Sequence, residues 1–235
     1  MKKFLFLSKL WVKMIFRLMF SCLSGGEICL VCQQRTLLYP VCPACRKKYF
    51  SVSMAGFGDA KFYRCGKDHI SVLKSLDRMY PLFSYRLWNK ELMFAWKSLE
   101  VRSLSLFFAG ILNKVLKEAG VEFIVPVPPR KGKVKEKGWD QIDELCNLLD
   151  YVYGFKILRL LERSTSKEQK KLGREGRLKQ IGSAYHLKKP YGAVPLSVCL
   201  LDDVCTTGST MESCAFLLKE AGIKEIKGFT LFIVD

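Results

Sequence analysis

The stretch that decides the fold runs from Pro195 to Met211, PLSVCLLDDVCTTGSTM. A short apolar run at residues 197–201 ends in two adjacent carboxylates, Asp202 and Asp203. A hydroxyl-rich turn follows, before a helix-periodic pattern begins; it comprises Cys205, Thr206, Thr207, Gly208, Ser209 and Thr210. Backbone N–H groups of such a turn, together with the N-terminus of the next helix, form an anion site. The stretch therefore predicts a strand, a phosphate-binding turn and a helix, with carboxylates suited to sugar hydroxyls or a magnesium ion.

This stretch resembles the phosphoribosyl pyrophosphate (PRPP) motif of type I phosphoribosyltransferases, in which apolar residues precede two acids and a Thr-Thr-Gly-x-Thr turn. By that resemblance Asp202 and Asp203 face the ribose 2- and 3-hydroxyls. The 5-phosphate is then held by the turn residues Thr206, Thr207, Gly208, Ser209 and Thr210. The alternative interpretation is a polar turn whose acid pair caps the following helix.

Composition allows one full domain with a packed core and a smaller appendage, because the chain has 235 residues and 49% of them are hydrophobic. The 39 Lys and Arg against 22 Asp and Glu leave a net charge of +17. Such a balance favours a polyanionic partner, either nucleic acid or an anionic membrane surface. A generally basic proteome is the alternative explanation.

Residues 1–23 are rich in apolar side chains, but Lys9, Lys13 and Arg17 recur at intervals of four and form one basic stripe on a helix. Three cations within the apolar stretch argue against a membrane span and against a signal peptide. Two interpretations stay open: a helix that packs on the next module with its basic edge in solvent, or a helix on a membrane surface.

Four cysteines have the spacing of a structural zinc site, because two Cys-x-x-Cys pairs stand nine residues apart; they are Cys29, Cys32, Cys42 and Cys45. Closing such a site contributes on the order of 10 kcal/mol to the folding of a small module. Free or disulfide-linked thiols are the alternative. Cys65 and His69 have no second pair of ligands nearby in the sequence. The metal-like spacing of the two Cys-x-x-Cys pairs predicts a reducing, cytosolic compartment.

The rest of the chain alternates strand-like and helix-like segments. We expect extended chain at 79–88, one long helix from Asn89 through Lys117, a strand at 122–127 and a helix after Trp139. Further strands are expected at 155–160, 197–201 and 227–234. This alternation predicts an α/β domain with a mostly parallel sheet flanked by helices, and a division into residues 1–80 and 81–235.

The order of motifs resembles that of the ComF (competence protein F) family of zinc-ribbon and phosphoribosyltransferase-like proteins. The cysteine pairs are followed by Val-Pro-Val-Pro at 125–128, Lys-Gly-Trp-Asp-Gln at 137–141 and the PRPP stretch. Other counterparts of family residues are Lys97, Arg163, Gln169, Leu172 and Arg177. The resemblance implies a type I phosphoribosyltransferase fold with a small N-terminal zinc-ribbon module, and a role in competence and DNA uptake.

For the ligand, the resemblance implies PRPP or a related ribose 5-phosphate compound bound with magnesium. Asp202 and Asp203 then orient the ribose, while Arg130, Lys131 and the chain after Val127 face the pyrophosphate. Phosphoribosyl transfer, a glycosyltransferase reaction, stays open.

The alternative is a non-catalytic accessory that binds single-stranded DNA and works with competence or recombination proteins. Its basic track comprises residues 130–137 and 167–179, with Trp139 or Tyr185 stacking on bases. Under either interpretation we expect a cytoplasmic protein that does not span a membrane, with contact to a membrane surface left open.

Overall fold

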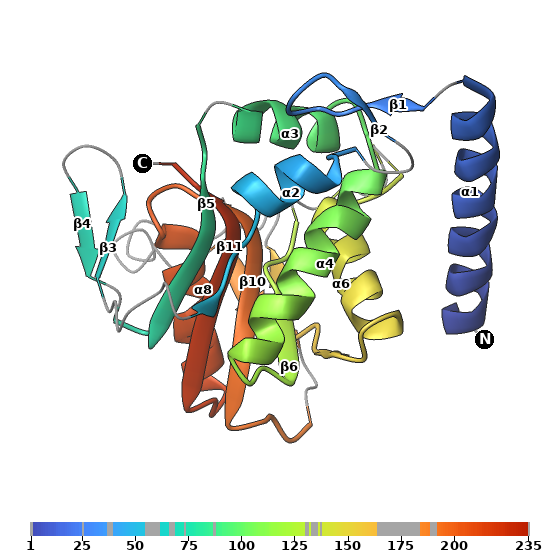
Figure 1. The fold of residues 1–235 in the computed structure, drawn as a ribbon. Helices are drawn as coiled ribbons and strands as arrows, with labels where there is room; N and C mark the ends of the chain where they lie inside the picture. Colours follow the sequence, from blue (N-terminus) through green and yellow to red (C-terminus); the bar gives the residue numbers. More distant parts are fainter. Residues whose placement is uncertain are drawn as a thin grey trace.

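The computed structural model describes residues 2–24, 26–36, 40–54, 62–65, 69–72, 74–86, 88–129, 132, 136, 138–163, 184–188 and 192–234. Its centre is a five-stranded sheet with the order β5-β11-β10-β6-β7, and every neighbouring pair is parallel (Figure 1). The strands are β5 (Arg78–Ser84), β6 (Phe123–Pro126), β7 (Lys156–Ile157), β10 (Ser197–Cys205) and β11 (Glu225–Ile233). The predicted α/β class is confirmed.

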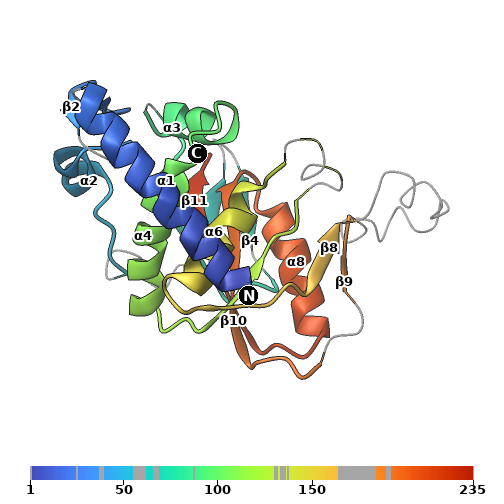
Figure 2. The same cartoon turned by 90° about the vertical axis from the view of Figure 1, so that its right-hand side faces the viewer.

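Helices cover both faces of the sheet, as a parallel sheet requires (Figure 2). On one face lie α3 (Trp88–Lys97), α4 (Ser103–Glu118) and α6 (Gln141–Tyr151); α8 (Ser209–Glu220) lies on the other. Because successive side chains of a strand point to opposite faces, Leu201 of β10 packs in the α3/α4/α6 core and Leu200 in the α8 core. The same alternation sends Asp202 and Asp203 to different faces.

The single long helix expected at 89–117 is wrong, because the structure has two helices separated by residues 98–102. Glu100 in this break has φ 55°, a left-handed conformation that a continuing helix does not tolerate. The Trp96 indole N–H donates to the Ser105 hydroxyl at 2.9 Å across the break. The break therefore ends α3 at Lys97, beside the sheet.

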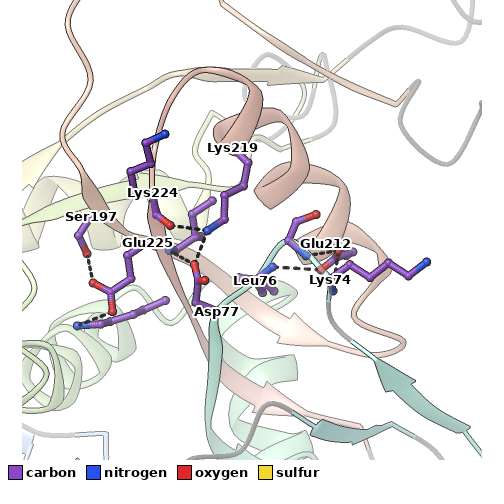
Figure 3. A network of polar contacts seen from close by, with 11 residues as sticks. Lys74, Leu76, Asp77, Ser197, Glu212, Lys219, Lys224 and Glu225 are labelled. Atoms are coloured by element: carbon purple, nitrogen blue, oxygen red, sulfur yellow. Dashed lines mark hydrogen bonds and ion pairs between the residues drawn. The ribbon is translucent and has the colours of Figure 1, made fainter.

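Polar contacts tie α8 to the strands beneath it (Figure 3). Glu212 in its first turn accepts hydrogen bonds from the backbone N–H groups of residues 74–76, at 3.0, 2.6 and 3.3 Å. At its other end Lys219 lies 2.6 Å from Asp77, which also accepts from the Ile226 N–H at 2.7 Å. These contacts fix the N-terminus of α8 relative to the sheet.

The remaining elements lie around this core. They are α1 (Lys2–Ser24), β1 (Glu27–Ile28), β2 (Arg35–Thr36), α2 (Pro43–Tyr49), β3 (Phe62–Cys65), β4 (His69–Val72), β8 (Leu161–Arg163) and β9 (Tyr185–Leu187). The pairs β1/β2, β3/β4 and β8/β9 are antiparallel. None of the helices in the described ranges combines the length and the apolar character needed to cross a bilayer. The division at residue 80 stays a prediction.

Candidate functional site

The four predicted zinc ligands come together near the N-terminus. The sulfur atoms of Cys29, Cys32, Cys42 and Cys45 all lie within 4.8 Å of one another. All four are free thiols, so the disulfide alternative does not hold. Cys42 caps α2 and Cys45 lies in its first turn, whereas Cys29 and Cys32 come from the turn that follows β1.

Backbone amides surround the sulfurs of this cluster. The Cys42 N–H donates to Cys29 Sγ at 3.3 Å, and the Cys45 N–H to Cys42 Sγ at 3.4 Å. Burial raises the pKa of Cys29, but hydrogen bonds from the backbone N–H groups of Cys42, Cys32 and Val31 outweigh this effect. The net result is a pKa lowered from 9.0 to about 7. Amide donors of this kind stabilise thiolates, and four sulfurs at these distances suit a tetrahedral zinc ion with no open position. The cluster can therefore hold structural zinc.

A second site lies at the carboxyl ends of β6 and β10, where a cavity of about 300 Å³ opens. Of the residues predicted for the ligand, it brings together Asp202, Asp203, Val127 and Thr210. The other lining residues are Pro128, Pro129, Asp140, Gln141, Ile142, Arg163 and Tyr185. Ligands of open parallel sheets bind at this edge, so the location agrees with the sequence prediction.

Asp203 is engaged by two partners that the sequence stretch did not indicate. Lys97 Nζ, at the end of α3, lies 2.8 Å from Asp203 Oδ2. The amide of Gln141, the first residue of α6, donates to the same oxygen at 2.5 Å. Asp203 therefore joins two helices to the sheet.

Asp202 differs from its neighbour. Its Oδ1 accepts the Asp203 backbone N–H at 2.8 Å. Burial and then the Asp203 charge raise the pKa of Asp202 to about 8, against the smaller lowering effects of that N–H and of Lys97. Burial and the Asp203 charge therefore favour the protonated form of the Asp202 carboxyl, which can exchange hydrogen bonds with sugar hydroxyls.

The predicted phosphate turn connects β10 to α8. Strand β10 continues through both aspartates to Cys205, so the turn itself is residues 206–208. Gly208 has φ 75°, the left-handed conformation that glycine adopts at little cost. The Thr207 and Ser209 hydroxyls lie 2.8 Å apart, the Ser209 N–H donates to Thr207 Oγ1 at 3.4 Å, and both side chains are exposed at the N-terminus of α8. Thr206 is exposed as well.

The remaining predictions concern basic residues and two aromatic residues expected to stack on bases. Arg130, Lys131, Lys137 and the segment 167–179 lie outside the described residues. Trp139 is only 7% exposed, and the Arg102 guanidinium lies 5.3 Å from its ring centroid, so base stacking on Trp139 is wrong. Tyr185 is also buried, with Arg163 over its ring. The sequence indicated Lys97 and Arg163 as counterparts of family residues but did not indicate the contact of Lys97 with Asp203. It also did not indicate that Tyr185 and Arg163 line the cavity, because these placements depend on the tertiary structure.

Together, fold and site describe an α/β protein with a five-stranded parallel sheet flanked by helices and a four-cysteine cluster near its N-terminus. The chain is 28% identical over 151 residues to competence protein ComFC of Streptococcus pneumoniae (strain ATCC BAA-255 / R6), a match that covers 64% of this chain and 66% of that protein. Its identity to competence protein ComFC of Bacillus subtilis (strain 168) is 25% over 207 residues, covering 88% and 78% of the two chains.

A third relative is competence protein F of Haemophilus influenzae (strain ATCC 51907 / DSM 11121 / KW20 / Rd), 30% identical over 111 residues, 45% of this chain and 48% of that protein. The matched region thus spans just under two thirds of the pneumococcal relative and about half of the Haemophilus one. No model of a protein family matches the chain. The three relatives confirm the predicted resemblance to the ComF family.

Proposed function

We propose that this chain binds PRPP, or a related ribose 5-phosphate ligand, together with magnesium, and that it serves DNA uptake in competence. The observation that carries the ligand proposal is the cavity in which Asp202, Asp203, Thr210 and Val127 meet at the carboxyl ends of two parallel strands. The role in competence rests on the relatives, which are named competence proteins.

In this proposal the 5-phosphate binds the turn at 206–208 and the first N–H groups of α8, where the helix dipole favours an anion. The ribose lies toward Asp202. The pyrophosphate lies toward the chain after Val127, where Pro128 and Pro129 have no N–H to donate, so side-chain cations must supply much of its binding. Bound magnesium supplies charge neutralisation at the pyrophosphate.

Calorimetry with PRPP and magnesium tests the proposal. We expect binding to the full chain, and a dissociation constant at least tenfold higher for Asp202→Ala, about 1.4 kcal/mol. Glu220→Gln, at the opposite end of α8, is the matched control and should bind as the parent does. Absence of binding heat for the unmodified chain, under conditions in which it is folded, would overturn the proposal.

A second candidate function is a single-stranded DNA-binding accessory that works with other competence or recombination proteins. It is favoured by the net charge of +17, which suits a phosphate backbone. We expect a gel shift with single-stranded DNA that weakens steeply as salt rises. A shift that is absent, or that salt leaves unchanged, contradicts this second candidate.

A further inference from the structure

Helix α1 contacts the rest of the protein along one seam and turns its other side outward. Phe6 and Leu10 pack against the core, and the Phe6 ring meets Tyr151 edge-on with centroids 5.1 Å apart. In Figures 1 and 2 the helix runs alongside α4 and α6 without being covered on its far side. The far side of α1 is therefore available to a partner.

This outward face of α1 is apolar. Phe4, Trp11 and Phe16 are 79%, 63% and 73% exposed, and Ile15 and Met19 are exposed as well. At 3.6 residues per turn, Phe4, Trp11, Ile15 and Met19 share an arc of about 80°. An exposed strip of this kind marks an interaction surface, because soluble monomers seldom leave large side chains in water so densely.

The charges of α1 have one sign. Residues 2–24 contain Lys2, Lys3, Lys9, Lys13 and Arg17 and no acidic residue. Lys9 and Lys13 are exposed and line a cavity of about 340 Å³ between α1 and the α4/α6 side of the domain, so they lie on the domain-facing side of the helix, roughly 120° and 160° from the middle of the apolar arc. Aromatic and aliphatic side chains on one face and cations on the opposite side are the pattern of a helix that lies in the headgroup region of a bilayer.

We propose that the outward face of α1 inserts into the surface of an anionic lipid bilayer and holds the protein there peripherally. The charge decides between occupants of this face. Two copies of a chain with a net charge of +17 repel one another, whereas an anionic leaflet attracts it. The apolar side chains of the arc enter the acyl boundary, and the cations on the opposite side of the helix stay outside it.

Sedimentation of the full chain with vesicles tests this proposal. We expect binding to vesicles containing 30% phosphatidylglycerol, at least tenfold weaker binding to pure phosphatidylcholine, and a loss of binding as salt rises. Trp11→Gln combined with Ile15→Gln should lower the partition coefficient at least tenfold, since glutamine preserves helix propensity. The matched control is Phe94→Gln with Phe216→Gln, two exposed aromatics on α3 and α8, which should bind as the parent does.

A conservative variant makes the test independent of folding. Brominated lipids should quench the fluorescence of bound parent protein, and Trp11→Phe should bind vesicles while losing most of that quenching, because Trp96 and Trp139 are buried and Trp88 is partly buried against the core. Equal binding by the parent and the double glutamine variant overturns the proposal. So does a parent that dimerises without lipid through this face, with the glutamine variant monomeric and its vesicle binding unchanged.

Discussion

Lys97 Nζ lies 2.8 Å from Oδ2 of Asp203, a residue that lines the candidate ligand cavity, and connects the end of α3 to strand β10. Gln141 donates to the same oxygen, so Asp203 is held by two helices. Asp202, one residue earlier, accepts the backbone N–H of Asp203 and faces the α8 side. The two adjacent acids therefore differ in their contacts: Asp203 is joined to α3 and α6, and in the proposed complex Asp202 is the acid that meets the ribose.

The ion pair predicts the effect of removing its cation. Lys97→Met leaves the Asp203 carboxylate, 12% exposed, without its charge partner, and we expect a loss of about 1–3 kcal/mol in the free energy of unfolding. Adding Asp203→Asn should recover part of that loss, because the unpaired charge is removed. Lys90→Met, on the same helix but exposed, should change stability by less than about 0.5 kcal/mol in urea unfolding. Equal effects at positions 90 and 97 would contradict this role for the pair.

The Asp202 carboxyl predicts a pH dependence of stability. Its pKa rises from 3.8 to about 8 on folding, so the folded chain holds this proton more tightly than the unfolded chain does. The resulting stability is fully present below pH 3.8 and is lost as pH rises through 8. Urea unfolding of the parent should therefore lose stability relative to Asp202→Asn between pH 5 and 8.5, by up to about 1.4 kcal/mol per pH unit. Parallel pH profiles for the two proteins would refute the shifted pKa.

Gly208 offers a test that separates backbone strain from ligand binding. Its φ of 75° means that Gly208→Ala should cost about 1 kcal/mol of stability. Gly120, with φ 66° and no atoms near an added Cβ, should show a similar cost on change to alanine. Only Gly208→Ala should weaken binding of ribose 5-phosphate in calorimetry, because only this position shapes the turn before α8. Equal affinities for the two variants would remove the turn from the phosphate site.

The cysteine cluster predicts one zinc ion per chain. Cys42→Ser should lose the metal in elemental analysis and lower the melting temperature, since three sulfurs and a hydroxyl hold zinc less well. Cys146→Ala removes a buried thiol outside the cluster and should retain the metal, even where it lowers stability. A parent protein that folds and melts identically with and without a zinc chelator would show that the cluster holds no structural metal.

Local features of the sequence were enough to predict the fold class, the strand–turn–helix around residues 197–210 and the cysteine cluster. Each rests on neighbours in sequence: an apolar run forms a strand, Gly208 adopts a left-handed turn, and paired Cys-x-x-Cys segments present two sulfurs each. Such features follow from short-range sterics and residue spacing, which do not depend on how distant parts of the chain pack.

Tertiary structure alone decided the rest. The break at residues 98–102 ends α3 where Lys97 reaches Asp203, and Gln141 reaches the same oxygen across 62 residues of sequence. Packing buries Trp139, although its position in a basic segment suggests an exposed aromatic residue. Packing also leaves one face of α1 uncovered. These outcomes depend on which distant side chains fill the space around a residue, and that is a property of the packed chain, since local sequence sets only conformational preference.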